Sequence, residues 1–503
     1  MTPEQPEDKA PAQPTDKAGA QPADEASTEP TGHPTAGARG AAPRRPGGLP
    51  VLVVGKPELV STDGVRSLPA GAPAISSDGR FVAFVSESGD LVADDANGAA
   101  DVFVRDTALN RTVLVSASIY GGSAAGSSLQ PSISADGRFV AFTSAAPDLV
   151  EDDSNGSLDV FLHDLRTGIT QLVSRGSRGE LADNDSYSPS LSADGRFVAY
   201  SSMATNLDPH DTNASPDVFM FDRLTGRTTL VSAGSDGQSG HGPSGQPSIS
   251  ANGRLIAFTS AARFAADDTN DDMDVYVHDM VTGENELVSR ATDGSAGNGA
   301  SLEPALSADG DVVAFTSVAD NLIEGDTNAA SDVFVRRRST GETDLISATP
   351  DGLPGDGPSR APGISGDGAR VAFLSAAGDL TPGTTRSAGS TGSAEPVAVP
   401  DAAVPDQDHA YVRDLDGAGT ALAAGTRRRT PGDGESTGVA ISSWGRHVAF
   451  SDTSTDLPGA PEDALPGEHV YVAGLRTAHV PAPSVIPPDG QRAGSGSDEE
   501  PQS

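Results

Sequence analysis

Short apolar segments alternate with polar turns along most of this chain, and they return at a nearly fixed interval. A phrase best written PSISADGRFVAFTS occurs seven times, with its central glycine at Gly79, Gly137, Gly195, Gly253, Gly310, Gly368 and Gly445. Successive glycines are 58, 58, 58, 57, 58 and 77 residues apart. Self-similarity at such a period is typical of a repeat architecture, in which each copy forms one unit that packs on its neighbours.

Each repeat predicts four β-strands joined by tight turns. In the second repeat we expect strands at residues 131–134, 139–144, 159–164 and 171–174. The second strand is rich in residues that favour β-structure, and the third, DVFLHD, alternates apolar and polar residues. Asp136-Gly137 and Thr167-Gly168 have the residue types of hairpin turns. Four strands in series form one propeller blade, so the pattern predicts an all-β, seven-bladed β-propeller with four antiparallel strands per blade.

The two ends of the repeat region predict how the ring closes. The last repeat has no fourth strand of the LVS type, whereas PELVS at residues 57–61 precedes the first blade. If this N-terminal strand pairs with the last blade, every blade has four strands and no sheet edge stays open.

Composition divides the rest of the chain. Residues 1–50 and 481–503 are rich in Pro, Ala, Gly and acidic residues, so we expect two disordered tails around a propeller at residues 51–480. A similar low-complexity segment at about residues 381–404 accounts for the long sixth step.

The charge excludes some classes of partner. With 33 basic and 71 acidic residues the net charge is −38, which disfavours nucleic acid as a partner. There is no cysteine and no apolar run long enough to cross a membrane. The N-terminus lacks the features of a secretion signal, so we expect a cytoplasmic monomer, or an exported protein if translation starts upstream.

A spacing D-x-N-x-x-x-D recurs between the second and third strands of five blades. Carboxylate and amide oxygens at alternate positions suit calcium, which takes six to eight oxygen ligands. In the competing interpretation, Asp and Asn hydrogen-bond to the backbone of their own turn and the last Asp fixes the start of the third strand. The candidate metal ligands are Asp95, Asn97, Asp101, Asp153, Asn155, Asp159, Asp211, Asn213, Asp217, Asp268, Asn270, Asp274, Asp326, Asn328 and Asp332. In the last two blades His409 and His469 stand at the position of the final Asp.

Other motifs give little indication of catalysis. The Asp of the repeated Asp-Gly pair is replaced by Asn252 in one copy and by Trp444 in another, which favours a role in the turn. One G-x-S-x-G match, Gly434 to Gly438, lies in a loop between blades rather than between a strand and a helix. The sequence predicts no catalytic residue.

The unit PSISADGR-FVAF…DVFVRD…TGxTxLVS resembles the TolB-type, WD-repeat-like β-propeller family of bacteria over about residues 57–475. The resemblance implies a protein-binding platform, or a regulatory domain such as those found in some hydrolases. The α/β domain that precedes the propeller in TolB has no counterpart here, so a lipoprotein partner is not implied.

Strand order places the D-x-N segments and the long loops between blades on the same side of the ring. Because function in scaffold folds concentrates on long loops, we predict an acidic binding face there. The first hypothesis is a non-enzymatic propeller that binds a protein or peptide, with calcium as a candidate cofactor. The alternative is a hydrolase or lyase with an acidic site at the central channel, and the fold alone does not decide between them.

Overall fold

The computed structural model describes residues 49–63, 67–68, 70–381, 407–428, 430–458, 460 and 467–480. These residues form twenty-nine β-strands. No α-helix occurs among them, and therefore no helix of the described residues could span a membrane. The disorder expected for residues 1–50 and 481–503 and the insertion expected at about 381–404 fall outside the described residues, apart from Leu49, Pro50 and Thr381.

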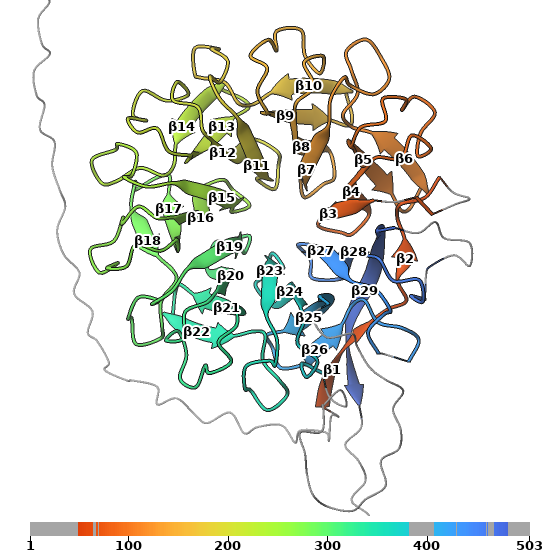
Figure 1. Ribbon diagram of the computed structural model, residues 1–503, viewed down its shortest axis with the longest axis vertical. Coiled ribbons are helices and arrows are strands. Elements are labelled where there is room, and N and C mark those ends of the chain that lie inside the picture. The colour runs from red at the N-terminus through yellow and green to blue at the C-terminus, as the bar shows by residue number, and fades with distance from the viewer. Residues whose placement is uncertain are drawn as a thin grey trace, which may run out of the picture. The chain divides into compact units, whose positions relative to one another are not determined.

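The described strands form seven antiparallel sheets around a common axis, which confirms the predicted seven-bladed propeller (Figure 1). In the first six sheets the strand nearest the axis comes first in sequence and the others follow outward, whereas the outermost strands of the seventh sheet come from the N-terminal end of the described chain. Neighbouring inner strands contact one another around the whole ring. We number the blades 1 to 7 from β3.

The strand bounds repeat from blade to blade. The inner strands are β3 (Gly71–Ile75), β7 (Ser128–Ile133), β11 (Ser186–Leu191), β15 (Ser244–Ile249), β19 (Ser301–Leu306), β23 (Ser359–Ile364) and β27 (Ser436–Ile441). The second strands are β4 (Phe81–Ser86), β8 (Phe139–Ser144), β12 (Phe197–Ser202), β16 (Leu255–Ser260), β20 (Val312–Ser317), β24 (Arg370–Ser375) and β28 (His447–Asp452). The third strands are β5 (Asp101–Asp106), β9 (Asp159–Asp164), β13 (Asp217–Asp222), β17 (Asp274–Asp279), β21 (Asp332–Arg337), β25 (His409–Asp414) and β29 (His469–Val480). The outer strands are β6 (Arg111–Leu114), β10 (Ile169–Leu172), β14 (Arg227–Leu230), β18 (Asn285–Leu287), β22 (Glu342–Leu345) and β26 (Gly419–Leu422), and β1 (Leu49–Val54) and β2 (Glu58–Leu59) complete blade 7.

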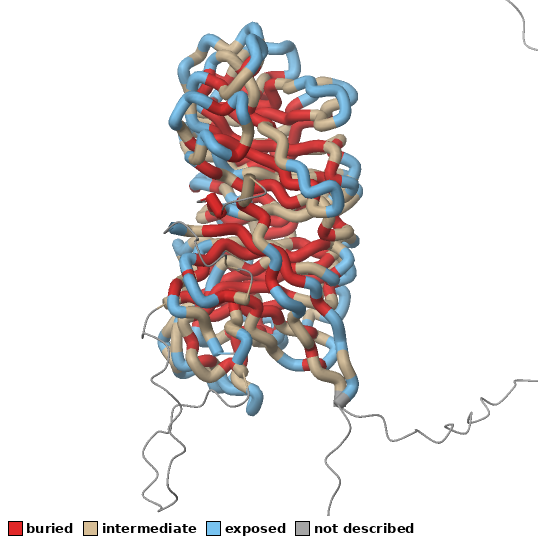
Figure 2. Tube along the Cα trace, turned by 90° about the vertical axis from the view of Figure 1, so that its right-hand side faces the viewer, coloured by how far each residue is buried: buried red, intermediate tan, exposed pale blue. Residues whose placement is uncertain are grey.

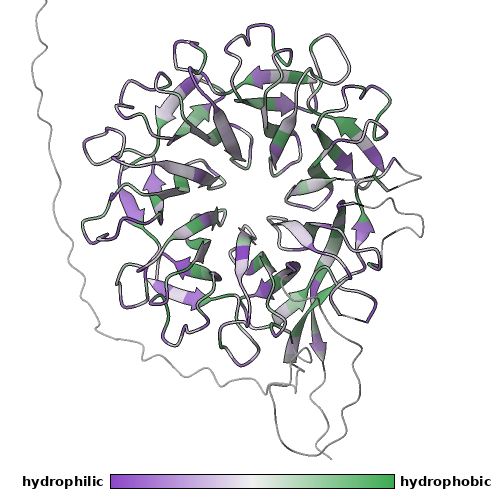
Figure 3. Ribbon diagram, in the orientation of Figure 1, coloured by the Kyte–Doolittle hydropathy of each residue, from purple (hydrophilic) through white to green (hydrophobic). Residues whose placement is uncertain are grey.

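The core lies between the blades and is built by the second and third strands. Every residue of β8 is buried, and its sequence FVAFTS supplies the β-branched and aromatic side chains that suit a sheet covered on both faces. Phe142 of β8 stacks on Phe161 of β9 with ring centroids 5.8 Å apart. An equivalent stacked pair occurs in all seven blades. Seen from the edge, buried segments lie between the two faces of the propeller, and the loops on those faces are exposed (Figure 2). The outer strands are mostly hydrophilic (Figure 3).

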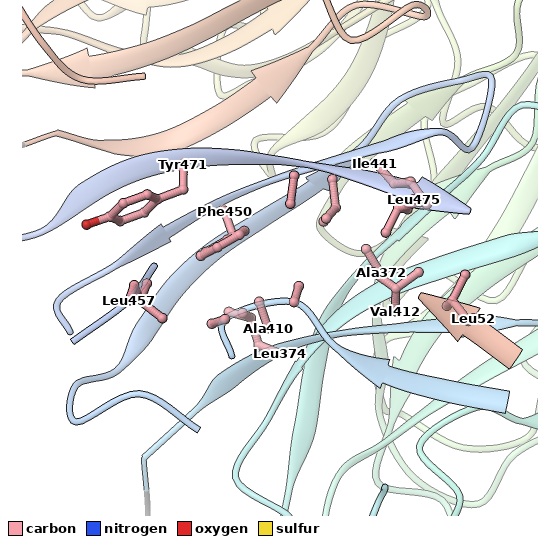
Figure 4. Packing of buried hydrophobic residues seen from close by; sticks show 14 of the residues in the cluster. Leu52, Ala372, Leu374, Ala410, Val412, Ile441, Phe450, Leu457, Tyr471 and Leu475 are labelled. Atoms are coloured by element: carbon pink, nitrogen blue, oxygen red, sulfur yellow. The ribbon is translucent and has the colours of Figure 1, made fainter. Parts of the chain in front are cut away.

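Ring closure follows the prediction and extends it. β2, from the PELVS segment, pairs with β29 through Glu58–Val472 and Leu59–Tyr471, as expected. β1 was not predicted: it pairs with the continuation of β29, from Leu49–Val480 to Val54–Leu475. Leu52 and Leu475 extend the core cluster between blades 6 and 7 (Figure 4). Two N-terminal strands therefore hold the last blade.

The hairpins between first and second strands are joined around the axis by backbone hydrogen bonds. The amide of Ser77 donates to Ala135 O at 3.0 Å, and that of Ala135 to Ala193 O at 3.0 Å. The series continues through Ala251, Ala308, Gly366 and Ser443. Trp444 N closes it by donating to Ser77 O at 3.1 Å. The repeated phrase therefore builds a closed ring of seven hydrogen bonds at one end of the axis.

The inner strands begin three residues earlier than the sequence suggested. β7 starts at Ser128 rather than Pro131, because Ser128 and Leu129 pair with β8 before a β-bulge interrupts the register. Gln130 lies in that bulge with φ 52°, directly before the proline. β10 likewise covers 169–172 instead of 171–174. Each inner strand therefore contributes additional, variable residues at its start.

Candidate binding face

The D-x-N segments and the loops between blades contact each other, as the strand order predicts. Asn97 Nδ2 donates to the carbonyl of Ala124, 27 residues further on, at 2.8 Å. Asn155, Asn213, Asn270 and Asn328 make the same contact in their blades. We call the side that carries these two sets of loops the loop face, and the side that carries the hairpins the hairpin face.

In each D-x-N segment a serine hydroxyl binds the final Asp, and in blades 1, 3 and 5 the Asn side chain binds it as well. Asn97 Oδ1 accepts the Ala99 amide at 2.8 Å, and Asn97 Nδ2 also donates to Asp101 Oδ2 at 2.8 Å. Ser116 Oγ donates to Asp101 Oδ1 at 2.5 Å and accepts the Val102 amide. The serine bond recurs at Asp159, Asp217, Asp274 and Asp332. These contacts support the competing, structural interpretation of the spacing.

The five carboxyl groups at the start of the third strands are fully buried. Desolvation by burial raises the pKa of each to about 6, although hydrogen bonds from Ser and Asn oppose the rise. The residues are Asp101, Asp159, Asp217, Asp274 and Asp332. No cationic side chain is paired with any of them among the described ion pairs.

The first Asp of each segment lies nearer the surface in some blades than in others. Asp95 and Asp268 are buried, and the Tyr276 hydroxyl donates to Asp268 Oδ2. Asp153, Asp211 and Asp326 are half-buried. Desolvation raises the pKa of Asp95 and of these three. Within the described ranges no group of three or more acidic or histidine side chains is arranged to hold a metal ion, and calcium binding stays a prediction.

Blades 6 and 7 replace the buried carboxylate with a buried imidazole. Burial lowers the pKa of His409, and His469 Nδ1 lies 3.1 Å from Leu68 O. Ser436, the central residue of the G-x-S-x-G match, begins β27 and is fully buried. Its hydroxyl donates to Asp452 Oδ2 at 2.6 Å, which gives this serine a structural role.

The long loops between blades are less variable in conformation than in sequence. Each contains an isolated antiparallel bridge, for example Ala117 with Ser123 and Arg175 with Leu181. Some also bind the neighbouring blade: the Thr228 amide donates to Ser177 Oγ across 51 residues of sequence. The differences between blades on this face therefore lie in side chains rather than in loop shape.

The starts of the inner strands carry the clearest differences between blades. Ser128 N donates to Ala100 O, which places this end of β7 beside the end of the D-x-N segment of the preceding blade. The next residue is one of five types in the seven blades: Gly71, Leu129, Tyr187, Gly245, Leu302, Arg360 and Thr437. Sequence reasoning missed these positions because it started the strand at the proline. A serine precedes the variable residue in six copies, and this recurrence could have shown that the inner strand starts there.

These positions and their neighbours differ in polarity around the axis. We call the exposed apolar residues of blades 2, 3 and 5 the apolar sector: Leu129 (43%), Leu302 (36%), Met203 and Val318, with the half-exposed Tyr187. Blade 4, which lies between blades 3 and 5, has Gly245 at this position. A polar sector in blades 6 and 7 holds the Arg360–Asp408 ion pair at 2.6 Å and a hydrogen bond from Thr437 to Glu468.

Hydrogen bonds between bulges stiffen this part of the face. Gln130 Oε1 accepts the Ser188 amide of the next blade at 3.0 Å. Gln246 Oε1 accepts the amide of Glu303, and Glu303 Oε2 that of Ala361. The residues at both ends of these bonds have positive φ. A residue other than glycine keeps this conformation only where neighbouring contacts stabilise it. These bonds hold the backbone that presents the variable side chains between blades 2 and 3 and from blade 4 to blade 6.

Comparisons with known proteins concern the fold. No protein-family model matches the chain, and no curated protein matches it. Among solved structures it is similar to TolB from Acinetobacter baumannii (16% identity, TM-score 0.38), covering 69% of this chain and 63% of that one, so it spans less than two thirds of that relative. It is also similar to an oligogalacturonate lyase from Vibrio parahaemolyticus (12% identity, TM-score 0.47), covering 85% of this chain and 98% of that one. A third similar structure is the tricorn protease (14% identity, TM-score 0.43), with 84% of this chain and 35% of that one covered. At these identities the likeness is one of propeller architecture alone.

Proposed function

We propose that this chain is a non-enzymatic β-propeller that binds a protein or peptide through its loop face around the axis. One observation carries the proposal: the scaffold is uniform, whereas the starts of the inner strands differ between blades. Several exposed apolar side chains on the same face favour an interaction site there.

The two sectors indicate the chemistry of the partner. Leu129, Tyr187 and Leu302 offer apolar contacts to large side chains. The chain as a whole has a net charge of −38, so it attracts basic segments and repels acidic ones. We infer a partner segment with apolar anchor residues flanked by lysine or arginine.

Affinity capture with matched variants tests this proposal. Leu129→Ser combined with Leu302→Ser should abolish capture of the partner, because these side chains form the apolar sector. The control is Leu109→Ser combined with Val281→Ser, which removes side chains of similar size that are 67% and 75% exposed on the hairpin face. Loss of the partner in the control, with capture unchanged in the loop-face variant, would contradict the proposal.

The alternative, a hydrolase or lyase with acidic residues near the axis, predicts a different result. Glu303, Asp408 and Glu468 are the acidic residues nearest the starts of the inner strands in the contacts described above. If they were catalytic, changing each to its amide would abolish turnover of a substrate while partner capture stayed the same. Binding that depends on the apolar sector favours the first proposal.

A further inference from the structure

A cavity of about 450 Å³ opens on the hairpin face where blades 6 and 7 meet the closing strands. Trp444 and Arg446 from the last hairpin line it, together with Arg370, Asp414 and Asp416 of blade 6 and Thr477 of β29. Pro50 of β1 also borders it, so the cavity lies where the ring closes. It lies on the opposite side of the propeller from the loop face.

An arginine that follows the hairpin glycine normally has a carboxylate partner in its own blade. Arg80 binds Asp106 through Nε at 2.9 Å and Nη2 at 2.7 Å. The same bidentate pair joins Arg138 to Asp164, Arg196 to Asp222 and Arg254 to Asp279. Two parallel N–H···O bonds to one carboxylate are among the stronger interactions that a side chain makes.

Arg446 occupies this arginine position in blade 7, but its partner position is a glycine. His447 pairs with Gly474 as Phe81 pairs with Asp106, so Gly474 stands where the carboxylate would be. A Cβ atom placed on Gly474 would meet no other atom within 4 Å, so the space of the missing side chain is open. Arg446 is exposed and forms none of the ion pairs found among the described residues.

Arg370, the other cation that lines the cavity, already has partners, and the carboxylates of Asp367, Asp414 and Asp416 also border the cavity. Arg370 donates to Asp414 Oδ2 at 3.2 Å, to Gly445 O, and to Thr477 Oγ1 at 2.9 Å. Asp414 Oδ1 accepts the Asp416 amide. Arg446 is therefore the cation of this cavity that is available to an added anion.

Trp444 supplies an aromatic surface beside this arginine. It replaces the Asp or Asn of the other hairpins, and its side chain is 59% exposed. Its backbone amide is fixed by the bond to Ser77 O that closes the hairpin ring. The guanidinium carbon of Arg446 lies 6.0 Å from the centroid of the indole.

We propose that this cavity binds a ligand with a carboxylate group attached to an aromatic or flat apolar part. Gly474 is not itself a lining residue, so Arg446 connects the cavity with the place left open there. The ligand carboxylate takes that place and binds Arg446 through two parallel hydrogen bonds, as the aspartates do in four other blades. The apolar part lies against Trp444. A free organic acid and the C-terminal carboxylate of a peptide share this chemistry. The proposal is independent of binding at the loop face.

Intrinsic fluorescence reports this site selectively, because Trp444 is the only tryptophan in the chain. The full chain is titrated with N-acetylphenylalanine, and with N-acetylphenylalaninamide as the ligand that lacks the carboxylate. We expect a saturable change in emission with the acid and none with the amide. A tripeptide ending in phenylalanine and 3-phenylpropionate then distinguish the two sources, since only one of them contains a peptide C-terminus. An equal response to the acid and its amide would overturn the proposal.

Two substitutions test the role of Arg446. Arg446→Ala should weaken binding at least tenfold. Binding to this variant is measured by calorimetry, because the substitution also changes the surroundings of the Trp444 indole and hence its fluorescence. Gly474→Asp supplies an internal carboxylate and should also weaken binding at least tenfold, while the melting temperature stays the same or rises. Arg196→Ala, which removes the equivalent arginine of another blade, is the control and should leave binding unchanged. Tight binding to the Gly474→Asp variant would overturn the assignment.

Discussion

Five blades bury a carboxyl group at the start of the third strand without a cation beside it. Desolvation of these groups raises the pKa of each from 3.8 to about 6, so the folded protein binds protons that the unfolded chain releases. Their contribution to stability is fully present below about pH 4 and is lost as the pH rises through 6. The residues are Asp101, Asp159, Asp217, Asp274 and Asp332.

The arginine-paired carboxylates have the opposite effect. The hydrogen bonds from Arg196 and Arg254 hold the pKa of Asp222 and of Asp279 at about 2, so their contribution is present above pH 4 and lost as the pH falls through 2. The two sets together predict a maximum of stability near pH 4.

Urea unfolding at pH 4.5, 5.5 and 7.5 measures this dependence. We expect the free energy of unfolding to fall as the pH rises, and the slope to be smaller in Asp159→Asn, which removes one of the five groups. Asp152→Asn, at an exposed position in the same loop, should keep the parent slope. A free energy that increases from pH 4.5 to 7.5 would show that the burial effect is not dominant.

The hairpin glycines test a second effect at the residue scale. Gly137 has φ 72°, and a Cβ there would overlap the ring of Phe81 from the preceding blade. Gly168 has φ 70° but open space around it. Gly168→Ala should cost roughly 1–2 kcal/mol for the left-handed conformation, and Gly137→Ala roughly 1–3 kcal/mol more for the overlap. Equal losses in thermal or urea unfolding would show that Phe81 moves aside.

At the element scale, the sequence predicted the strands whose pattern recurs in each repeat and missed the segments that vary between repeats or lie outside them. The second and third strands and the PELVS closure follow from patterns that recur in each copy. The start of β7 was missed because Leu129 and Gln130 vary between copies and precede a conspicuous proline. β1 was missed because LPVLVV lies outside the repeat, and its pairing depends on residues 475–480 more than 400 positions away.

The closing strand β1 gives a prediction for the ring as a cooperative unit. Leu52 is buried at 4% exposure in the cluster between blades 6 and 7, so Leu52→Ala should cost roughly 2–5 kcal/mol. We expect a lower midpoint for the main thermal transition, monitored by circular dichroism. Val53→Ala, on the half-buried side of the same strand, should cost less. An unchanged midpoint for Leu52→Ala would mean that β1 separates locally before the propeller unfolds.

At the scale of the whole molecule, the propeller separates structure from recognition. The hairpin ring, the stacked aromatic pairs and the buried serine–aspartate bonds repeat in most or all blades and hold the scaffold. The positions that differ lie at the starts of the inner strands, in the last hairpin, and where the D-x-N spacing is lost. The candidate sites could not be predicted from the repeat, since they consist of departures from it.

Calcium binding is a prediction at the same scale, because five similar loops lie on one face. In the folded chain Asn97 Oδ1 and both oxygens of Asp101 accept hydrogen bonds, so a metal ion would have to displace these contacts. We therefore expect no calcium-specific rise in melting temperature. Any divalent cation screens a net charge of −38, so magnesium at equal concentration is the control. A ligand that binds the native state stabilises it by roughly 2.7 kcal/mol at a hundredfold excess over its Kd. A rise with calcium that magnesium does not produce, and that Asp95→Asn reduces, would instead assign these loops to the metal.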